Sequence, residues 1–245
     1  PFKECVTHGW TVDGEGKAMH KSLGNGVDPA DVFNENGADI LRLWAASADY
    51  HADVRCSKEI FKQLSQNYLK FRNTCKFMLD NLVDFDPEKL TKPEDMPVLD
   101  RWLLTKLNEL IEKAEQSYCD YEFHIITHAV NDFCVTTLSS FYLDIVKDRL
   151  YCDGADSLSR RSAQTALYLT LHTLSKLFAP ILAFTCDEIW LAMPHTGEDD
   201  ARNVVLNEMN KPFTAYALTA EEMANWEKLA EVRTVVNGVL EAARA

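Results

Sequence analysis

The residues best suited to chemistry lie in a short glycine-rich loop near the start of the chain. The loop spans residues 13–25 and reads DGEGKAMHKSLGN. Glycine lets the backbone come close to a phosphate group, and the ammonium group of a lysine such as Lys21 neutralises phosphate charge. Asp28 and Pro29 follow, with the residue types that cap and begin a helix. On composition alone an exposed polar loop is the simpler interpretation, because the P-loop order G-x-x-x-x-G-K-[ST] is missing.

A second candidate feature is a basic segment. Residues 55–79 contain six basic residues and one acid, although the whole chain has a net charge of −13. The basic residues are Arg55, Lys58, Lys62, Lys70, Arg72 and Lys76. An acidic protein is not coated with phosphate-binding groups, but a local basic face can still bind RNA. A solvated helix face explains the same charges equally well.

The elements that would position these residues are helices. Residues 58–82 carry apolar side chains at alternating steps of three and four, which predicts a long amphipathic helix in a bundle. Lys58 and Lys62 lie 14 residues before Arg72 and Lys76, close to four helical turns, so these four charges share one face. Similar patterns predict helices at residues 28–36, 39–47, 99–118, 122–150 and 159–178. Capping patterns predict a short helix capped by Thr185 and a last helix opened by Thr219 and Glu222. A short strand is expected near residues 5–7, and the polar segment 194–212 is expected to hold at most one short strand, near residues 204–206. The fold is therefore expected to be mainly α, a helical bundle preceded by a small irregular region.

Other charged residues allow two interpretations each. Lys147 and Arg149 end the helix at 122–150, where they could contact RNA phosphates or favour the helix C-terminus electrostatically. His124 and His128 have the spacing of a helical metal pair, but the HExxH pattern is missing and a partly buried polar face is favoured.

Arg160 and Arg161 begin a helix, where the dipole disfavours cations. They therefore require either an anionic ligand or a salt bridge to Asp153 or Asp156.

Composition narrows the class of protein. The seven cysteines are scattered and include no C-x-x-C pair, which argues against a zinc site within the chain and for reduced thiols. No apolar run reaches the length of a membrane span, and no signal peptide is visible. We expect a cytoplasmic protein with no membrane contact.

The glycine-rich loop resembles the K-M-S-K-S signature of the class I aminoacyl-tRNA synthetases. Two further blocks, GADILRLW at residues 37–44 and SFYLDIVKDRLY at residues 140–151, are similar to the isoleucyl branch of that family. The resemblance covers essentially the whole chain. The signature departs from the family at Ala18, where a lysine is usual, and at His20, where a serine is usual, whereas Lys21 is kept. Lys17, one place early, is a candidate substitute for the missing lysine.

This resemblance implies a division into three parts. Residues 1–57 would be the end of a catalytic domain with the loop and a stem-contact segment. Residues 58–218 would form an anticodon-binding helical bundle, and residues 219–245 would start a C-terminal junction helix. The parent enzyme would join isoleucine to tRNA(Ile) with ATP, and Lys21 would stabilise the triphosphate as a catalytic and ATP-binding residue, assisted by Met19 and Ser22. The H-I-G-H element is missing, so we expect a piece of a larger ligase that is inactive alone.

The resemblance also implies partners and cofactors. The candidates for tRNA contact are Arg55, Lys58, Lys62, Arg72, Lys76, Lys147 and Arg149. ATP and Mg²⁺ would belong to the parent enzyme and zinc to its C-terminal region, with none bound to this chain, which we expect to be a monomer. Two alternatives remain open, a fragment of a valyl-type synthetase and a stand-alone helical module that binds RNA or protein.

Overall fold

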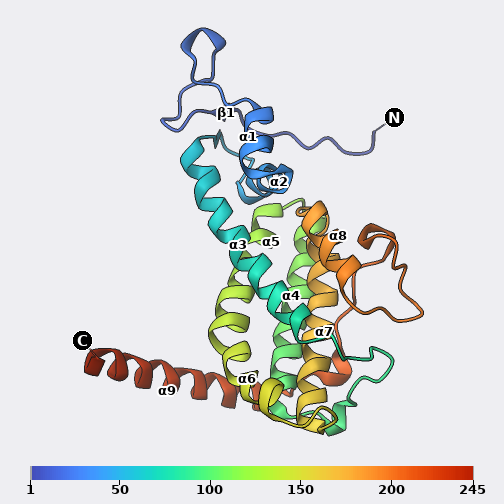
Figure 1. The fold of residues 1–245 in the computed structure, drawn as a ribbon. Coiled ribbons are helices and arrows are strands. Elements are labelled where there is room, and N and C mark those ends of the chain that lie inside the picture. Colours follow the sequence, from blue (N-terminus) through green and yellow to red (C-terminus); the bar gives the residue numbers. More distant parts are fainter. Residues whose placement is uncertain (1, 245) are drawn as a thin grey trace.

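The computed structural model describes residues 2–244, which form a mainly α-helical protein (Figure 1). The prediction of a mainly α fold is confirmed. The elements are β1 (Thr11–Val12), α1 (Pro29–Asn36), α2 (Ala38–Ser47), β2 (Val54–Arg55), α3 (Lys58–Asp80), α4 (Val98–Cys119), α5 (Phe123–Asp132), α6 (Leu143–Cys152), α7 (Leu158–Phe178), α8 (Ala183–Ala192) and α9 (Ala220–Arg244). Short 3₁₀ helices lie at Lys21–Leu23, Pro93–Asp95, Val204–Leu206 and Thr214–Tyr216.

The helices from α3 to α8 surround one hydrophobic core. Met78, Leu107 and Trp190, from α3, α4 and α8, are all completely buried in it. The region with α1, α2 and the two short strands lies at one end of the bundle, and α9 projects from the other end (Figure 1). The glycine-rich loop is therefore held at the end of the bundle remote from α9.

Helix ends follow the capping chemistry of the sequence. The side chain of Asp28 accepts a hydrogen bond from the backbone N–H of Ala30, and Pro29 is the first residue of α1, as predicted. Before α9, Thr219 and Glu222 form the expected reciprocal pair, in which each side chain accepts from the other residue's backbone N–H.

The helix expected at residues 122–150 is continuous but changes its winding. The chain runs from α5 through a π-helical segment, Phe133–Tyr142, into α6. The hydroxyl of Ser140 donates to the carbonyl of Val135, five residues earlier, within this segment. The wider π turn is not encoded in a three-four repeat, because that repeat describes α-helical spacing.

Two local predictions were wrong, at residues 5–7 and at Thr185, and the one strand allowed at residues 204–206 does not form. The first strand lies at Thr11–Val12 and not at residues 5–7, and it pairs in parallel with β2. Its position is explained by Val12, whose side chain is buried. Residues 204–206 form a 3₁₀ turn, capped by the side chain of Asn203. Thr185 lies inside α8 rather than at its cap, and its hydroxyl donates to Asp39 at 2.6 Å.

Candidate phosphate loop and nucleic-acid interface

The side chain of Asn25 closes the glycine-rich loop. Its amide nitrogen donates to Asp13 at 2.8 Å and to the carbonyl of Ala18 at 3.1 Å. Its oxygen accepts from the backbone N–H of His20 at 2.9 Å. The hydrogen bond from Asn25, followed by that from the Lys17 backbone, lowers the pKa of Asp13. Asn25 therefore shapes the loop, a role that its place at the end of the signature did not reveal.

The signature residues have different surroundings within this loop. Met19 is half-buried against a small apolar cluster that contains Val32, Ile40 and Phe61. Lys21 and Ser22 are exposed in the 3₁₀ turn, and Lys21 forms no ion pair within residues 2–244. The turn ends at Gly24, whose φ of 62° lies in the left-handed region that glycine adopts without strain. Met19 thus anchors the loop, and the Lys21 ammonium is available to an anion.

Lys17 is less suited to replace the missing lysine. Its ammonium lies 2.7 Å from the carboxylate of Glu15 in the same turn. Both side chains are exposed, so the pair is weak, but it lowers the local positive charge.

The basic residues predicted on α3 are all exposed, as is Arg55 just before the helix. Because α3 is one uninterrupted helix, Lys58, Lys62 and Lys76 lie along one face. Lys58 lies 3.3 Å from Glu35 and Lys76 lies 2.7 Å from Asp80. Among the residues that the structure describes, Arg55, Lys62, Lys70 and Arg72 form no ion pair, so they carry the least compensated charge.

Acidic residues border the start of this basic face. A groove of about 370 Å³ separates α1 from α3, and its walls include Asp31 and Glu35 as well as Lys58 and Lys62. The negative side chains reduce the attraction of Lys58 for a phosphate. The middle of α3, around Lys70 and Arg72, is consequently the part of the helix with the most favourable charge.

Lys147 and Arg149 have contrasting positions in α6. Lys147 is exposed and pairs with Asp144 at 2.9 Å. The guanidinium of Arg149 instead donates to both carboxylate oxygens of Asp100, at 2.9 and 2.6 Å, and to Ser159. The structure therefore brings Arg149 into a largely buried ion pair and not to the exposed basic face, and we do not retain it as a candidate RNA contact.

Arg160 and Arg161 are also held by carboxylates, and the dominant partner is Asp84. Arg160 binds both oxygens of Asp84, at 2.6 and 2.9 Å, and the hydrogen bond from Arg160 lowers the pKa of Asp84 to about 2. Arg161 donates to the Asp84 carbonyl and to Asp156. No sequence pattern identifies Asp84, which is 76 residues from Arg160.

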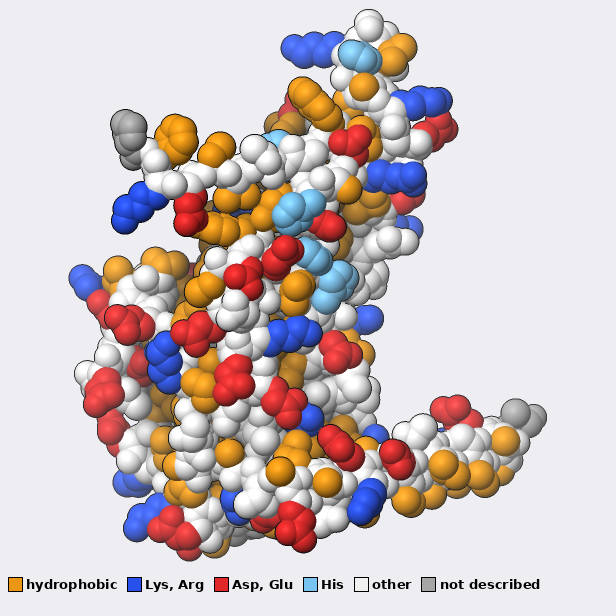
Figure 2. Space-filling model, turned by 180° about the vertical axis from the view of Figure 1, so that it is seen from behind, with side chains coloured by type: hydrophobic (Ala, Val, Ile, Leu, Met, Phe, Trp, Pro, Cys, Tyr) orange, Lys and Arg blue, Asp and Glu red, His pale blue; other side chains and the backbone are white. Residues whose placement is uncertain are grey.

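The remaining surface carries mixed charge. Figure 2 shows acidic and basic side chains interspersed over the bundle and an apolar strip along α9. The strip contains the exposed side chains of Leu229, Val232, Val236 and Val239. Within residues 2–244, no cluster of three His, Cys, Asp or Glu side chains is arranged to hold a metal ion. No helix in this range is long and apolar enough to cross a membrane.

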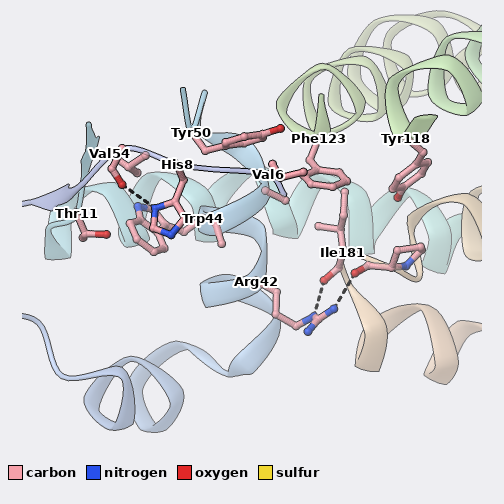
Figure 3. Close-up of a pocket in the computed structure, with 14 residues that line it drawn as sticks. Val6, His8, Thr11, Arg42, Trp44, Tyr50, Val54, Tyr118, Phe123 and Ile181 are labelled. Carbon is pink, nitrogen blue, oxygen red and sulfur yellow. Dashed lines mark hydrogen bonds between the residues drawn. The ribbon is translucent and has the colours of Figure 1, made fainter. Parts of the chain in front are cut away.

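A cavity of about 570 Å³ lies where the N-terminal region meets the bundle (Figure 3). Aromatic side chains of Tyr50, Tyr118 and Phe123 line it, together with His8 and Arg42. Its walls are therefore drawn from both parts of the molecule, and the cavity marks the joint between them.

Comparison with family models gives two matches. Residues 100–245 match the anticodon-binding domain of tRNA ligase. Residues 1–57 match the class I tRNA synthetases for isoleucine, leucine, methionine and valine.

Curated relatives align with the entire chain. It is 49% identical over 246 residues to an isoleucine–tRNA ligase of Moorella thermoacetica and 50% identical to one of Carboxydothermus hydrogenoformans. The alignments cover 100% of the chain but 26% of each relative, so the chain spans about a quarter of the length of these ligases.

Two solved structures share the fold at low identity. A complex of LeuRS with tRNA from Agrobacterium radiobacter has a TM-score of 0.67 at 20% identity, over 86% of this chain and 24% of that chain. The methionyl-tRNA synthetase of Mycobacterium tuberculosis has a TM-score of 0.62 at 19% identity, over 76% of this chain and 38% of that chain.

Proposed function

Because the chain belongs to the anticodon-binding domain family of tRNA ligases, we propose that its bundle binds the anticodon stem and loop of tRNA(Ile). The observation that carries this proposal is the match of residues 100–245, supported by relatives described as isoleucine–tRNA ligases along the full chain. In this proposal residues 58–218 are the binding bundle and residues 219–245 begin the junction to a following region.

The exposed cations of α3 would contact the tRNA backbone. Each lysine or arginine that neutralises a phosphate releases condensed counterions, which favours binding and makes it sensitive to salt. Among the four cations that share one face of α3, Lys62 and Arg72 are the strongest candidates, because neither is paired with a carboxylate in the described part of the chain. Lys58, Lys76 and Lys147, which are each paired with a carboxylate, would contribute less, and Arg55 would add an unpaired charge just before α3. The net charge of −13 disfavours RNA elsewhere on the surface, so binding by the chain alone should be weak.

The loop at residues 13–25 would serve the parent ligase. With ATP and Mg²⁺ in that enzyme, the exposed ammonium of Lys21 would stabilise negative charge on the triphosphate while isoleucine is activated. Ser22 lies beside it in the 3₁₀ turn, and Met19 anchors the loop. The zinc site and the monomeric state that the resemblance implies remain predictions.

A salt titration with paired variants tests the RNA proposal. Binding of a tRNA(Ile) transcript to the chain is measured by fluorescence anisotropy between about 50 and 200 mM salt. The double variant Lys62→Ala/Arg72→Ala should reduce the slope of log affinity against log salt by about 1.4 to 1.8, since each of the two phosphate contacts contributes about 0.7 to 0.9.

Lys89→Ala/Lys211→Ala is the matched control, because these side chains are 82% and 79% exposed and lie outside α3. It should leave the slope unchanged. An α3 variant that binds with the affinity and slope of the parent chain would contradict the proposed interface.

The same assay addresses the two alternatives. Equal or tighter binding of tRNA(Val) would favour the valyl-type assignment, and no preference for any tRNA over a DNA duplex would favour a general binding module. We also expect no isoleucine-dependent pyrophosphate exchange by the chain alone.

A further inference from the structure

Two oppositely charged side chains of α2 contact the corner where α7 ends and α8 begins. The Nε of Arg42 donates to the carbonyl of Ile181 at 2.9 Å, and one terminal nitrogen donates to the carbonyl of Pro180 at 2.7 Å (Figure 3). The carboxylate of Asp39 accepts from the backbone N–H of Thr185 at 2.8 Å and from its hydroxyl at 2.6 Å. Asp39 is only 7% exposed, so these contacts are made inside the joint.

The charges of α2 match the electrostatics of this corner. The carbonyls of Pro180 and Ile181, in the turn after α7, are ordinary backbone acceptors, and the first amides of α8 carry the partial positive charge of a helix N-terminus. Arg42 meets the carbonyls and Asp39 meets the amides. Since the two residues are three positions apart, they lie on one side of α2. Reversing or shifting α2 would separate Arg42 from the turn carbonyls and Asp39 from the amides of α8, so the observed placement is the one that satisfies both side chains.

Apolar packing alone would not define this placement so closely. Leu43, which follows Arg42, is buried in the bundle core, and Ala46 packs against the same core. Hydrophobic contact is non-directional and tolerates small sliding movements, whereas hydrogen bonds of a buried carboxylate and a guanidinium have defined geometry. Asp39 and Arg42 therefore set the register between α2 and the bundle.

Helix α2 is also hydrogen-bonded to the strands that carry the glycine-rich loop. The indole N–H of Trp44 donates to the carbonyl of Arg55 in β2 at 2.9 Å. Strand β2 pairs with β1, and the backbone N–H of Cys56 donates to the carbonyl of Val12 at 2.8 Å. Asp13 follows directly and binds Asn25, which closes the loop around Lys21. Hydrogen bonds therefore connect the α7–α8 corner, through α2, to the base of the loop.

We propose that Asp39 and Arg42 are positioning residues that hold the RNA-binding bundle in one register with the loop-bearing region. Neither contacts the reacting groups. This role rests on the proposed function. By fixing the bundle relative to the loop-bearing region, the two residues would orient the bound RNA toward the reaction centre of the ligase. Small misplacements of a reacting group are costly, so loss of register should slow transfer to RNA more than it weakens RNA binding.

The test uses the full-length ligase with Arg42→Ala. Three quantities are measured: the single-turnover rate of isoleucine transfer from preformed adenylate to tRNA, the tRNA dissociation constant, and pyrophosphate exchange without tRNA. We expect transfer to fall about tenfold, with the other two within about twofold of wild type. Arg42→Lys, which can still donate to one carbonyl, should recover at least half of the lost rate.

Arg101→Ala is the matched control. The Arg101 guanidinium also donates to two backbone carbonyls, those of Tyr216 and Ala217, but both lie within the bundle region. It should lower thermal stability without slowing transfer. Equal slowing by both variants, unchanged transfer in Arg42→Ala, or an equal fall in pyrophosphate exchange would each overturn the positioning role. Failure of the RNA proposal is recognised separately, by α3 variants that leave tRNA binding unchanged.

Discussion

Replacement of Arg149 by alanine should destabilise the fold without weakening RNA contacts. Asp100 is fully buried, and its carboxylate accepts from Arg149, from the Tyr142 hydroxyl at 2.7 Å and from the Ser162 hydroxyl at 2.6 Å. Removing the guanidinium leaves a buried negative charge with two neutral donors. Breaking a buried ion pair in this way costs about 3 to 5 kcal/mol. We expect a value near the lower limit, about 3 kcal/mol, because the two hydroxyls remain.

The prediction is checked by urea denaturation followed by circular dichroism, with tRNA anisotropy measured under conditions where the variant is folded. Lys147→Ala is the comparison, since its pair with Asp144 joins side chains that are 49% and 61% exposed. That exposed pair contributes about 0 to 1 kcal/mol, so stability should barely change. If Arg149→Ala weakened tRNA binding while the free energy of unfolding changed by less than about 1 kcal/mol, the assignment of Arg149 to the interior would be refuted.

Two further predictions concern pH and the loop. Burial lowers the pKa of His172 below the ordinary histidine value of 6.5, although a hydrogen bond to Asp199 opposes the shift. The folded chain therefore binds fewer protons than the unfolded chain as the pH falls through this range. The free energy of unfolding should therefore decrease from pH 7 to pH 5. The variant His172→Gln can keep the hydrogen bonds without titrating, so urea denaturation should show a weaker dependence of its unfolding free energy on pH. Identical pH dependence in the two proteins would refute the role of His172. Asn25→Ala removes the three hydrogen bonds that close the loop, so it should slow pyrophosphate exchange by the full-length ligase about tenfold with little change in stability. Asn36→Ala is the control and should have no effect. Unchanged exchange in Asn25→Ala would contradict the loop geometry.

The sequence predicted the helices well where short-range patterns control them. The apolar repeat from Phe61 onward placed α3 within two residues of its observed end. The caps at Asp28 and Thr219 were also correct, because a cap depends only on residues two or three positions away. The exposure of Lys62 and Arg72 follows from the same repeat, since the polar face of an amphipathic helix lies opposite its buried face.

Contacts between distant segments could not be predicted in this way. Arg149 looked like a surface cation at a helix end, but its partner Asp100 is 49 residues earlier and lies beside it only after α4 and α6 pack together. Thr185 had the spacing of a cap, yet its hydroxyl binds Asp39, 146 residues away. A single sequence contains no record of such pairs, because side-chain types and local spacing do not specify which helix faces meet.

The sequence by itself determined the helical class, the basic character of α3 and the presence of a lysine in a glycine-rich loop. Each depends on composition or on periodicity over a few turns. Only the tertiary structure decided which charges are paired: it placed Arg149, Arg160 and Arg161 against carboxylates and, among the described residues, left Lys21, Lys62 and Arg72 without one. The physical reason is that burial and pairing of a charge are set by the neighbours that packing supplies, and those neighbours come from remote parts of the chain.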